Sequence, residues 1–344
     1  MRIEYIIIQS SKLKGDYMLD IFNPQISVVA KGLEGKTIMV YGGNNLGKTL
    51  QATRMKKPLY LPFEKGLNAI SGVPHVPINS WADFKKWNKQ LTSLATVEKA
   101  RELYGTIIFD EVEASAKYCQ KYINSVYGVS RLKDGNEGFG LWKEYETEYW
   151  TEINQLAGAG YTVIFIAHKT ENKNGFILPK GDKRALEPII DNCDIVVYLE
   201  SNGIDEDKRV IKSSAYLAQT DTFFARSRFD YIDTYIKEFT AENLEDAIIK
   251  AIEKQEKAEG VKAVSFKEQK ITFESEVLDY DQLMSDIGLI GEKFINSDNV
   301  SQLVEIVEKY LGKGKKVSEC TKMQIEVMSV IYNDLVERAK ELSL

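Results

Sequence analysis

The sequence is poor in the side chains that build metal sites and disulfide frameworks. Its three cysteines, Cys119, Cys193 and Cys320, are odd in number and widely spaced, and its two histidines are His75 and His168. No zinc-ligand spacing can be assembled from this set, and no disulfide framework is indicated. We therefore expect reduced thiols in a cytoplasmic protein.

Long hydrophobic runs are also missing. The longest run near the start, Tyr5–Ile8, is far shorter than the about 20 apolar residues of a membrane helix or the core of a signal peptide. The sequence therefore indicates neither export nor a membrane partner. No internal repeat is apparent either.

The composition is that of an ordinary globular protein. The 344 residues are 44% hydrophobic and 28% charged, enough for one large or two modest domains. The net charge is −6, and residues 241–344 hold 14 Lys and Arg against 21 Asp and Glu. A negative total does not exclude nucleic-acid binding, because such binding depends on local patches.

One stretch carries a specific chemical signal. The apolar run Ile38–Tyr41 leads into a match to G-x-x-x-x-G-K-[ST], made up of Gly42, Gly43, Asn44, Asn45, Leu46, Gly47, Lys48 and Thr49. In this pattern the loop turns backbone N–H groups onto a polyphosphate, Lys48 reaches the outer phosphates and the Thr49 hydroxyl ligates Mg²⁺. The stretch predicts a site for ATP or another nucleoside triphosphate, with Mg²⁺.

A second element supports this prediction. The apolar run Thr106–Phe109 ends in the carboxylate pair Asp110 and Glu111. Phosphate-loop enzymes hold Mg²⁺ with such an aspartate at the end of a buried strand, so Asp110 is the expected metal anchor.

Apolar strands alternate with helical patterns as far as residue 240. The continuous run Tyr161–His168 is typical of a parallel strand buried on both faces, and Asp194–Leu199 reads as a further strand. This order predicts an α/β fold with a mainly parallel sheet and a ligand at the carboxyl ends of the strands. Beyond Thr240 the pattern is helical only.

These patterns suggest four segments. We expect an ATPase core over residues 18–240, a helical extension over 241–298 and a C-terminal helical hairpin over 299–344. Residues 1–17 are hypothesised to be an upstream extension, because Lys14–Met18 can be encoded by a purine-rich ribosome-binding sequence placed before a start codon at Met18. The alternative is a genuine N-terminal strand at Glu4–Gln9.

The order of motifs resembles that of the RecA-like phosphate-loop ATPases. The resemblance is greatest to the bacteriophage members associated with single-strand annealing and recombination. The resemblance covers about residues 30–235. It implies a RecA-like core whose general base is a glutamate after the second strand, here Glu64. The alternative base is Glu111, as in the AAA+ branch. We favour Glu64, because a carboxylate placed across from Asp110 can orient water for attack on the γ-phosphate.

The same resemblance gives His168 the place of a polar γ-phosphate sensor, which is often Gln; a purely structural histidine is the alternative. It also places two DNA-contacting loops at 128–140 and 169–184, where the second loop has a net charge of +3. The alternative is that both are solvated surface loops. The candidate DNA-binding residues are Arg131, Lys133, Lys173, Lys180, Lys183 and Arg184.

The segment Ala225–Phe229 resembles those from which RecA-like ring motors send basic residues into a neighbouring subunit's nucleotide. Arg226 and Arg228 are two residues apart, so they project to one side of an extended strand. The resemblance implies a homo-oligomer, either a ring or a filament. Two surface arginines on an edge strand are the alternative.

Together these features predict a DNA-stimulated ATPase that binds single-stranded DNA in phage recombination, annealing or replication. It would work in the cytoplasm of an infected or lysogenic bacterial host, and a single-strand-binding protein is an expected partner. Two alternatives stay open, a hexameric helicase-like translocase and an ATP-switched protein-interaction module with slow turnover.

Overall fold

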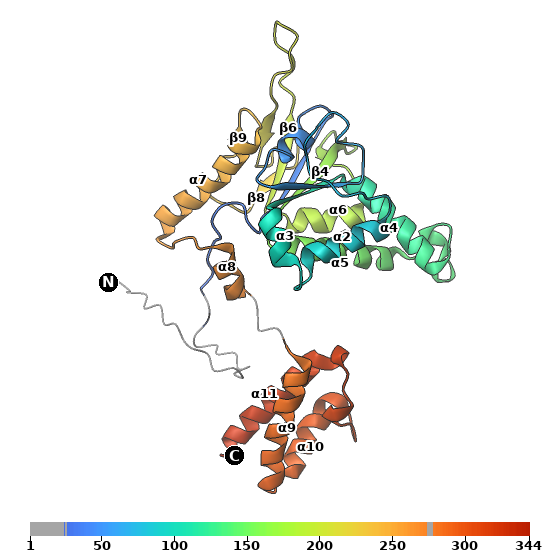
Figure 1. Ribbon diagram of the computed structural model, residues 1–344, viewed down its shortest axis with the longest axis vertical. Coiled ribbons are helices and arrows are strands. Elements are labelled where there is room, and N and C mark those ends of the chain that lie inside the picture. The colour runs from blue at the N-terminus through green and yellow to red at the C-terminus, as the bar shows by residue number, and fades with distance from the viewer. Residues whose placement is uncertain (1–23, 25, 274–277) are drawn as a thin grey trace. The chain divides into compact units, whose positions relative to one another are not determined.

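The computed structural model describes residues 24, 26–273 and 278–344 (Figure 1). The expected upstream extension, residues 1–17, and its alternative strand lie outside these ranges. The chain divides into a larger unit, Val28–Gln269, and a second unit that contains the helices after Lys270.

The larger unit alternates strands and helices. Its strands are β1 (Thr37–Gly42), β2 (Pro58–Pro62), β3 (Thr106–Asp110), β4 (Thr162–Glu171), β5 (Ile177–Pro179), β6 (Ile195–Glu200), β7 (Ser214–Tyr216), β8 (Arg226–Ser227) and β9 (Tyr235–Ile236). Its helices are α1 (Lys48–Ala52), α2 (Trp81–Thr92), α3 (Val97–Leu103), α4 (Val112–Tyr127), α5 (Trp142–Gly158), α6 (Lys183–Asn192) and α7 (Ala241–Glu259), while α8 (Phe266–Phe273) begins in it.

The sheet is mainly parallel, as the sequence predicts. Its strand order is β2-β3-β4-β1-β6-β7-β9, and the first five of these strands are parallel. β7, β8 and β9 pair antiparallel. Gly42 pairs with His168 and Pro62 pairs with Asp110, so the residues that end these strands share one edge of the sheet. We call it the carboxyl edge.

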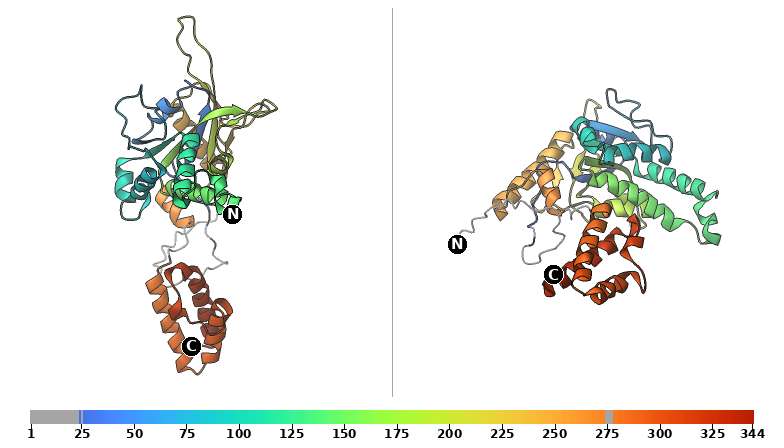
Figure 2. Two further views of the ribbon diagram at one scale, coloured as in Figure 1. Left: turned by 90° about the vertical axis from the view of Figure 1, so that its right-hand side faces the viewer. Right: turned by 60° about the horizontal axis from the view of Figure 1, so that its bottom comes forward.

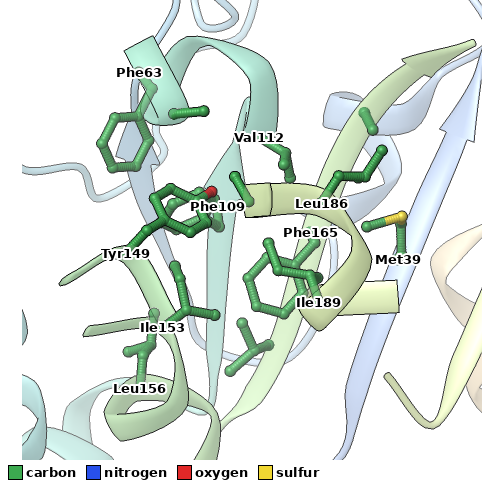
Figure 3. Packing of buried hydrophobic residues seen from close by; sticks show 14 of the residues in the cluster. Met39, Phe63, Phe109, Val112, Tyr149, Ile153, Leu156, Phe165, Leu186 and Ile189 are labelled. Carbon is green, nitrogen blue, oxygen red and sulfur yellow. The ribbon is translucent and has the colours of Figure 1, made fainter. Parts of the chain in front are cut away.

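Helices α2, α4, α5 and α6 cover one face of the sheet. Figure 3 shows this packing, in which side chains of β1, β3 and β4 meet those of α4, α5 and α6. The buried residues labelled there include Met39, Phe109, Val112, Tyr149, Ile153, Phe165, Leu186 and Ile189. Tyr145, Tyr149 and Ile153 form the buried side of α5, whereas Trp142 at its start is 36% exposed.

The other face is covered by α1 and α7. Leu244, Ile248 and Ile252 of α7 pack with Ile38 of β1 and Ile164 of β4. The expected boundary at residue 240 therefore differs from the structure, because the apolar side of α7 is needed to cover the sheet.

In the described part of the second unit, the helices α9 (Tyr280–Asn296), α10 (Val300–Leu311) and α11 (Ile325–Glu341) pack together. Leu283 and Phe294 of α9 share one core with Met328, Ile331 and Leu335 of α11. The expected hairpin of residues 299–344 thus lacks the helix that fills its core, and the expected boundary at 298 also differs from the structure. No helix in the described ranges is long and apolar enough to cross a membrane.

Two surface segments extend from the sheet, and the first differs from its expected form. Residues 169–184, expected as a loop, form a hairpin of β4 and β5 and then the start of α6. The hairpin forms because Lys169–Glu171 continue β4 and pair antiparallel with Ile177–Pro179. Ser201–Ser213, between β6 and β7, projects beyond the sheet in Figures 1 and 2. Its two arms are joined by a bridge between Ile204 and Val210.

Candidate active site

The phosphate loop connects β1 to α1 at the carboxyl edge. Gly47 has φ 84°, a left-handed conformation that favours glycine, and a Cβ at Gly42 would lie 2.7 Å from the Leu199 carbonyl oxygen. The buried Lys48 folds back over the loop, where its Nζ donates to the carbonyl oxygens of Gly42 (3.2 Å) and Gly43 (2.6 Å). The loop therefore keeps its lysine beside the backbone that would surround a phosphate.

Asp110 meets the end of this loop. Its Oδ2 accepts hydrogen bonds from the Thr49 hydroxyl at 2.7 Å and from the Tyr60 hydroxyl at 2.9 Å. Asp110 is fully buried, and burial raises the pKa of its carboxyl. The sequence did not single out Tyr60, since a tyrosine within an apolar strand looks like any other core residue.

The donor set around Asp110 fits a magnesium ion. Among the described residues, Asp110 Oδ1 and Glu111 Oε1 are buried without a hydrogen-bond partner. Oxygen ligands and retained waters are what Mg²⁺ prefers in nucleotide sites. Thr49 and Asp110 would hold the ion, whose charge offsets that of the phosphates.

Three further side chains gather at the same edge. One ligand atom each from Glu64, Glu111 and His168 lies within 4.8 Å of the other two. His168 Nε2 is 4.0 Å from Glu64 Oε2. The structure therefore brings both candidate bases and the candidate sensor to the phosphate loop, as expected for strands that end at a shared edge.

The two candidate bases have different surroundings. Glu111 is buried and caps α4 by accepting from the Ala114 N–H at 3.2 Å, whereas the Glu64 side chain is 39% exposed. Burial, followed by the charges of Glu64 and Glu113, raises the pKa of Glu111 to about 7. Burial and the nearby Lys48 lower the pKa of His168, so its imidazole is neutral near pH 7.

Comparison with known proteins gives the family. Residues 34–229 match the family model described as AAA domain. The chain belongs to the AAA domain family. Over 323 residues it is also 65% identical to the SPbeta prophage-derived uncharacterized protein YorG of Bacillus subtilis (strain 168), a match covering 94% of this chain and 99% of that protein. The chain is thus a phosphate-loop ATPase-type protein with a phage-derived relative.

Arg226 and Arg228 of this AAA domain lie away from its phosphate loop. β8 pairs Arg226 with Val196, near the amino end of β6, and the Arg228 N–H donates to the Asp194 carbonyl oxygen. Both guanidinium groups donate to the carbonyl oxygen of Asp191, at the end of α6. The structure does not bring them to the nucleotide site of their own chain.

The candidate DNA-binding residues of the AAA domain are exposed but mostly paired. Arg131 contacts Asp134, Lys180 contacts Glu113 at 2.9 Å and Lys183 contacts Glu187 at 3.1 Å. The Arg184 guanidinium lies over the Trp142 ring, 4.7 Å from its centroid. Lys133 and Lys173 are also exposed.

Proposed function

We propose that the protein is an ATPase that binds single-stranded DNA and acts in phage DNA recombination, annealing or replication. The observation that carries this proposal is the direct connection between the nucleotide site and the basic hairpin of β4 and β5. The Lys180 N–H donates to the His168 carbonyl oxygen at 2.8 Å, and Lys180 Nζ lies 2.9 Å from Glu113 Oε2. Glu113 is in the first turn of α4, two residues after Glu111.

This connection links hydrolysis to the hairpin. His168 and Lys169–Glu171 belong to the same strand, β4, and we propose that phosphate binding at His168 shifts this end of the strand. The pair Lys180–Glu113 must open for Lys180 to contact a DNA phosphate, and Glu113 lies beside the candidate base Glu111. Nucleotide state and DNA binding are therefore coupled in this proposal, as linkage requires in both directions.

The surface next to the hairpin suits a single strand. Phe139 is 82% exposed and precedes Trp142 by three residues in the chain. The Arg184 guanidinium, at the start of α6, lies over the Trp142 ring at the start of α5. Exposed aromatic rings with nearby cations are typical of surfaces that bind single-stranded nucleic acid, because every base offers a face for stacking.

In the proposed mechanism, Lys48 binds the outer phosphates and Thr49 and Asp110 hold Mg²⁺. Glu64 orients and deprotonates the attacking water, and Glu111 is the alternative base. Neutral His168 donates a hydrogen bond to the γ-phosphate. Arg226 and Arg228 lie at the end of the sheet opposite the phosphate loop, so they cannot serve the nucleotide of their own chain. In this proposal they act on the nucleotide of a neighbouring copy in a ring or filament.

The test is DNA affinity in two nucleotide states. Binding of a fluorescently labelled single strand is measured by anisotropy with a slowly hydrolysed ATP analogue and with ADP, each with Mg²⁺. The proposal predicts tighter binding with the analogue. Equal affinities would remove the coupling, and an absence of DNA binding would favour an ATP-switched module that binds a protein partner. Unwinding of a forked duplex would favour the translocase.

A further inference from the structure

Tyr60 occupies an unusual position for a core tyrosine. It lies in the middle of β2, is fully buried, and its hydroxyl donates to Asp110 Oδ2 on the neighbouring strand at 2.9 Å. With the Thr49 hydroxyl at 2.7 Å, this oxygen has two donors. The second oxygen, Oδ1, is buried without a partner among the described residues. The two donors therefore fix which oxygen of Asp110 stays available.

The Tyr60 hydroxyl also touches the loop that carries Glu64. A Cβ added at Gly66 would lie 2.3 Å from the Tyr60 hydroxyl oxygen and 2.9 Å from Asp110 Oδ2, so the loop closes directly over both groups. At the other end of the loop, the Phe63 N–H donates to the Asp110 carbonyl oxygen at 2.7 Å.

We propose that Tyr60 is a positioning residue that fixes the metal anchor Asp110 and the loop carrying Glu64 relative to each other. Its hydroxyl holds the Asp110 carboxylate so that Oδ1 stays available to a bound ion, and its packing against Gly66 keeps Glu64 at the carboxyl edge. The inference rests on the proposed role of Asp110 as the Mg²⁺ anchor. Hydrogen-bond partners of metal-binding groups commonly change metal affinity by about 10–100-fold when they are removed.

The test is the effect of Mg²⁺ on ADP binding, which requires no turnover. Affinity for fluorescent ADP is measured with Mg²⁺ and with EDTA for the wild type, Tyr60→Phe and Asp110→Asn. Tyr60→Phe keeps the ring and removes only the hydroxyl. We expect the Mg²⁺-dependent gain in affinity to fall about tenfold in Tyr60→Phe, with the affinity in EDTA unchanged.

Tyr161→Phe is a matched control. Tyr161 is also buried, and its hydroxyl donates to the Leu91 carbonyl oxygen at the same distance of 2.9 Å, in a contact that does not involve Asp110. This variant should keep the wild-type gain from Mg²⁺. A second test variant, Gly66→Ala, should reduce the gain as Tyr60→Phe does, because its methyl group displaces the Tyr60 hydroxyl and Asp110.

The outcomes separate the two claims. A wild-type gain from Mg²⁺ that is lost in Asp110→Asn but unchanged in Tyr60→Phe would overturn the role of Tyr60 alone. No gain in the wild type would overturn the metal anchor and the Tyr60 inference with it. Equal losses in Tyr60→Phe and Tyr161→Phe would assign the effect to general loss of packing and would also overturn the inference.

Discussion

The Thr49 hydroxyl donates to Asp110 Oδ2 at 2.7 Å, which joins the end of the phosphate loop to the end of β3. β4 lies between β1 and β3 in the sheet, so this contact joins residues that follow or end two strands that are not neighbours. Glu64 follows β2 and Glu111 follows β3, and a carboxylate oxygen of each lies within 4.8 Å of the other. The first prediction separates their roles.

Glu64→Gln should keep ATP binding and lose nearly all turnover, because the amide preserves shape but cannot accept a proton. Loss of a positioned general base commonly costs about 10²–10⁴-fold in rate. Glu111→Gln should retain more activity than Glu64→Gln. Phosphate release and nucleotide affinity are measured for both variants. The reverse ranking would assign the base to Glu111.

Neutralising Lys180, Lys183 and Arg184 together to Gln should weaken single-strand binding and reduce its salt dependence. Each lost phosphate contact lowers the slope of log affinity against log salt by about 0.7. The control replaces Lys250, Lys254 and Lys257 of α7 by Gln, which changes the charge equally. A slope that is unchanged in the first variant, or equally reduced in the control, would argue against this DNA site.

Mixing Arg228→Ala protein with Lys48→Ala protein should restore ATPase activity that neither has alone. Each variant lacks a different half of a site shared between copies, and a completed arginine contact can raise the rate by about 10³–10⁵. The specific activity of the wild type should also rise with protein concentration. Activity that is independent of concentration, together with no rescue on mixing, would argue for a monomeric ATPase.

Lys36→Met should stabilise the protein near pH 7. Burial lowers the pKa of Lys36 to about 8, while an unfolded chain has its ordinary value of 10.5. Between pH about 8 and pH 10.5, Lys36 binds more protons in the unfolded state than in the folded state. The free energy of unfolding therefore rises with pH over this range. The variant should therefore exceed the wild type in free energy of unfolding at pH 7 by about 3 kcal/mol, less the cost of losing the hydrogen bond from Lys36 Nζ to the Ala30 carbonyl oxygen. An equal difference at pH 7 and pH 10 in urea unfolding would contradict this.

Much of the site follows from the sequence because parallel strands bring their carboxyl ends together. The strand before Gly42, the strand before Asp110 and the run ending at His168 are each readable as apolar segments, and their register places the three residues at one edge. The pairing of strands then supplies contacts, such as Thr49 with Asp110, that no local pattern contains.

Other features depend on pairing or packing that the sequence does not reveal. β8 is two residues long and pairs antiparallel, so the edge at which Arg226 lies cannot be read from its neighbours in the chain. The apolar side of α7 is visible as a pattern, but not the sheet that it covers. Tyr60 is distinguished from other core tyrosines only by its closeness to Asp110, at the end of β3, and to Gly66, in the loop after β2.

The rate of ATP hydrolysis with and without single-stranded DNA shows directly whether the protein is a DNA-stimulated ATPase. The rate is measured with Mg²⁺ at one salt concentration, on protein whose oligomeric state is determined in the same buffer, with Lys48→Ala as the inactive control. The account predicts that single-stranded DNA raises the rate of the wild type, that duplex DNA raises it less, and that Lys48→Ala stays inactive throughout. A wild-type rate that is the same with single-stranded DNA, duplex DNA and no DNA would contradict it.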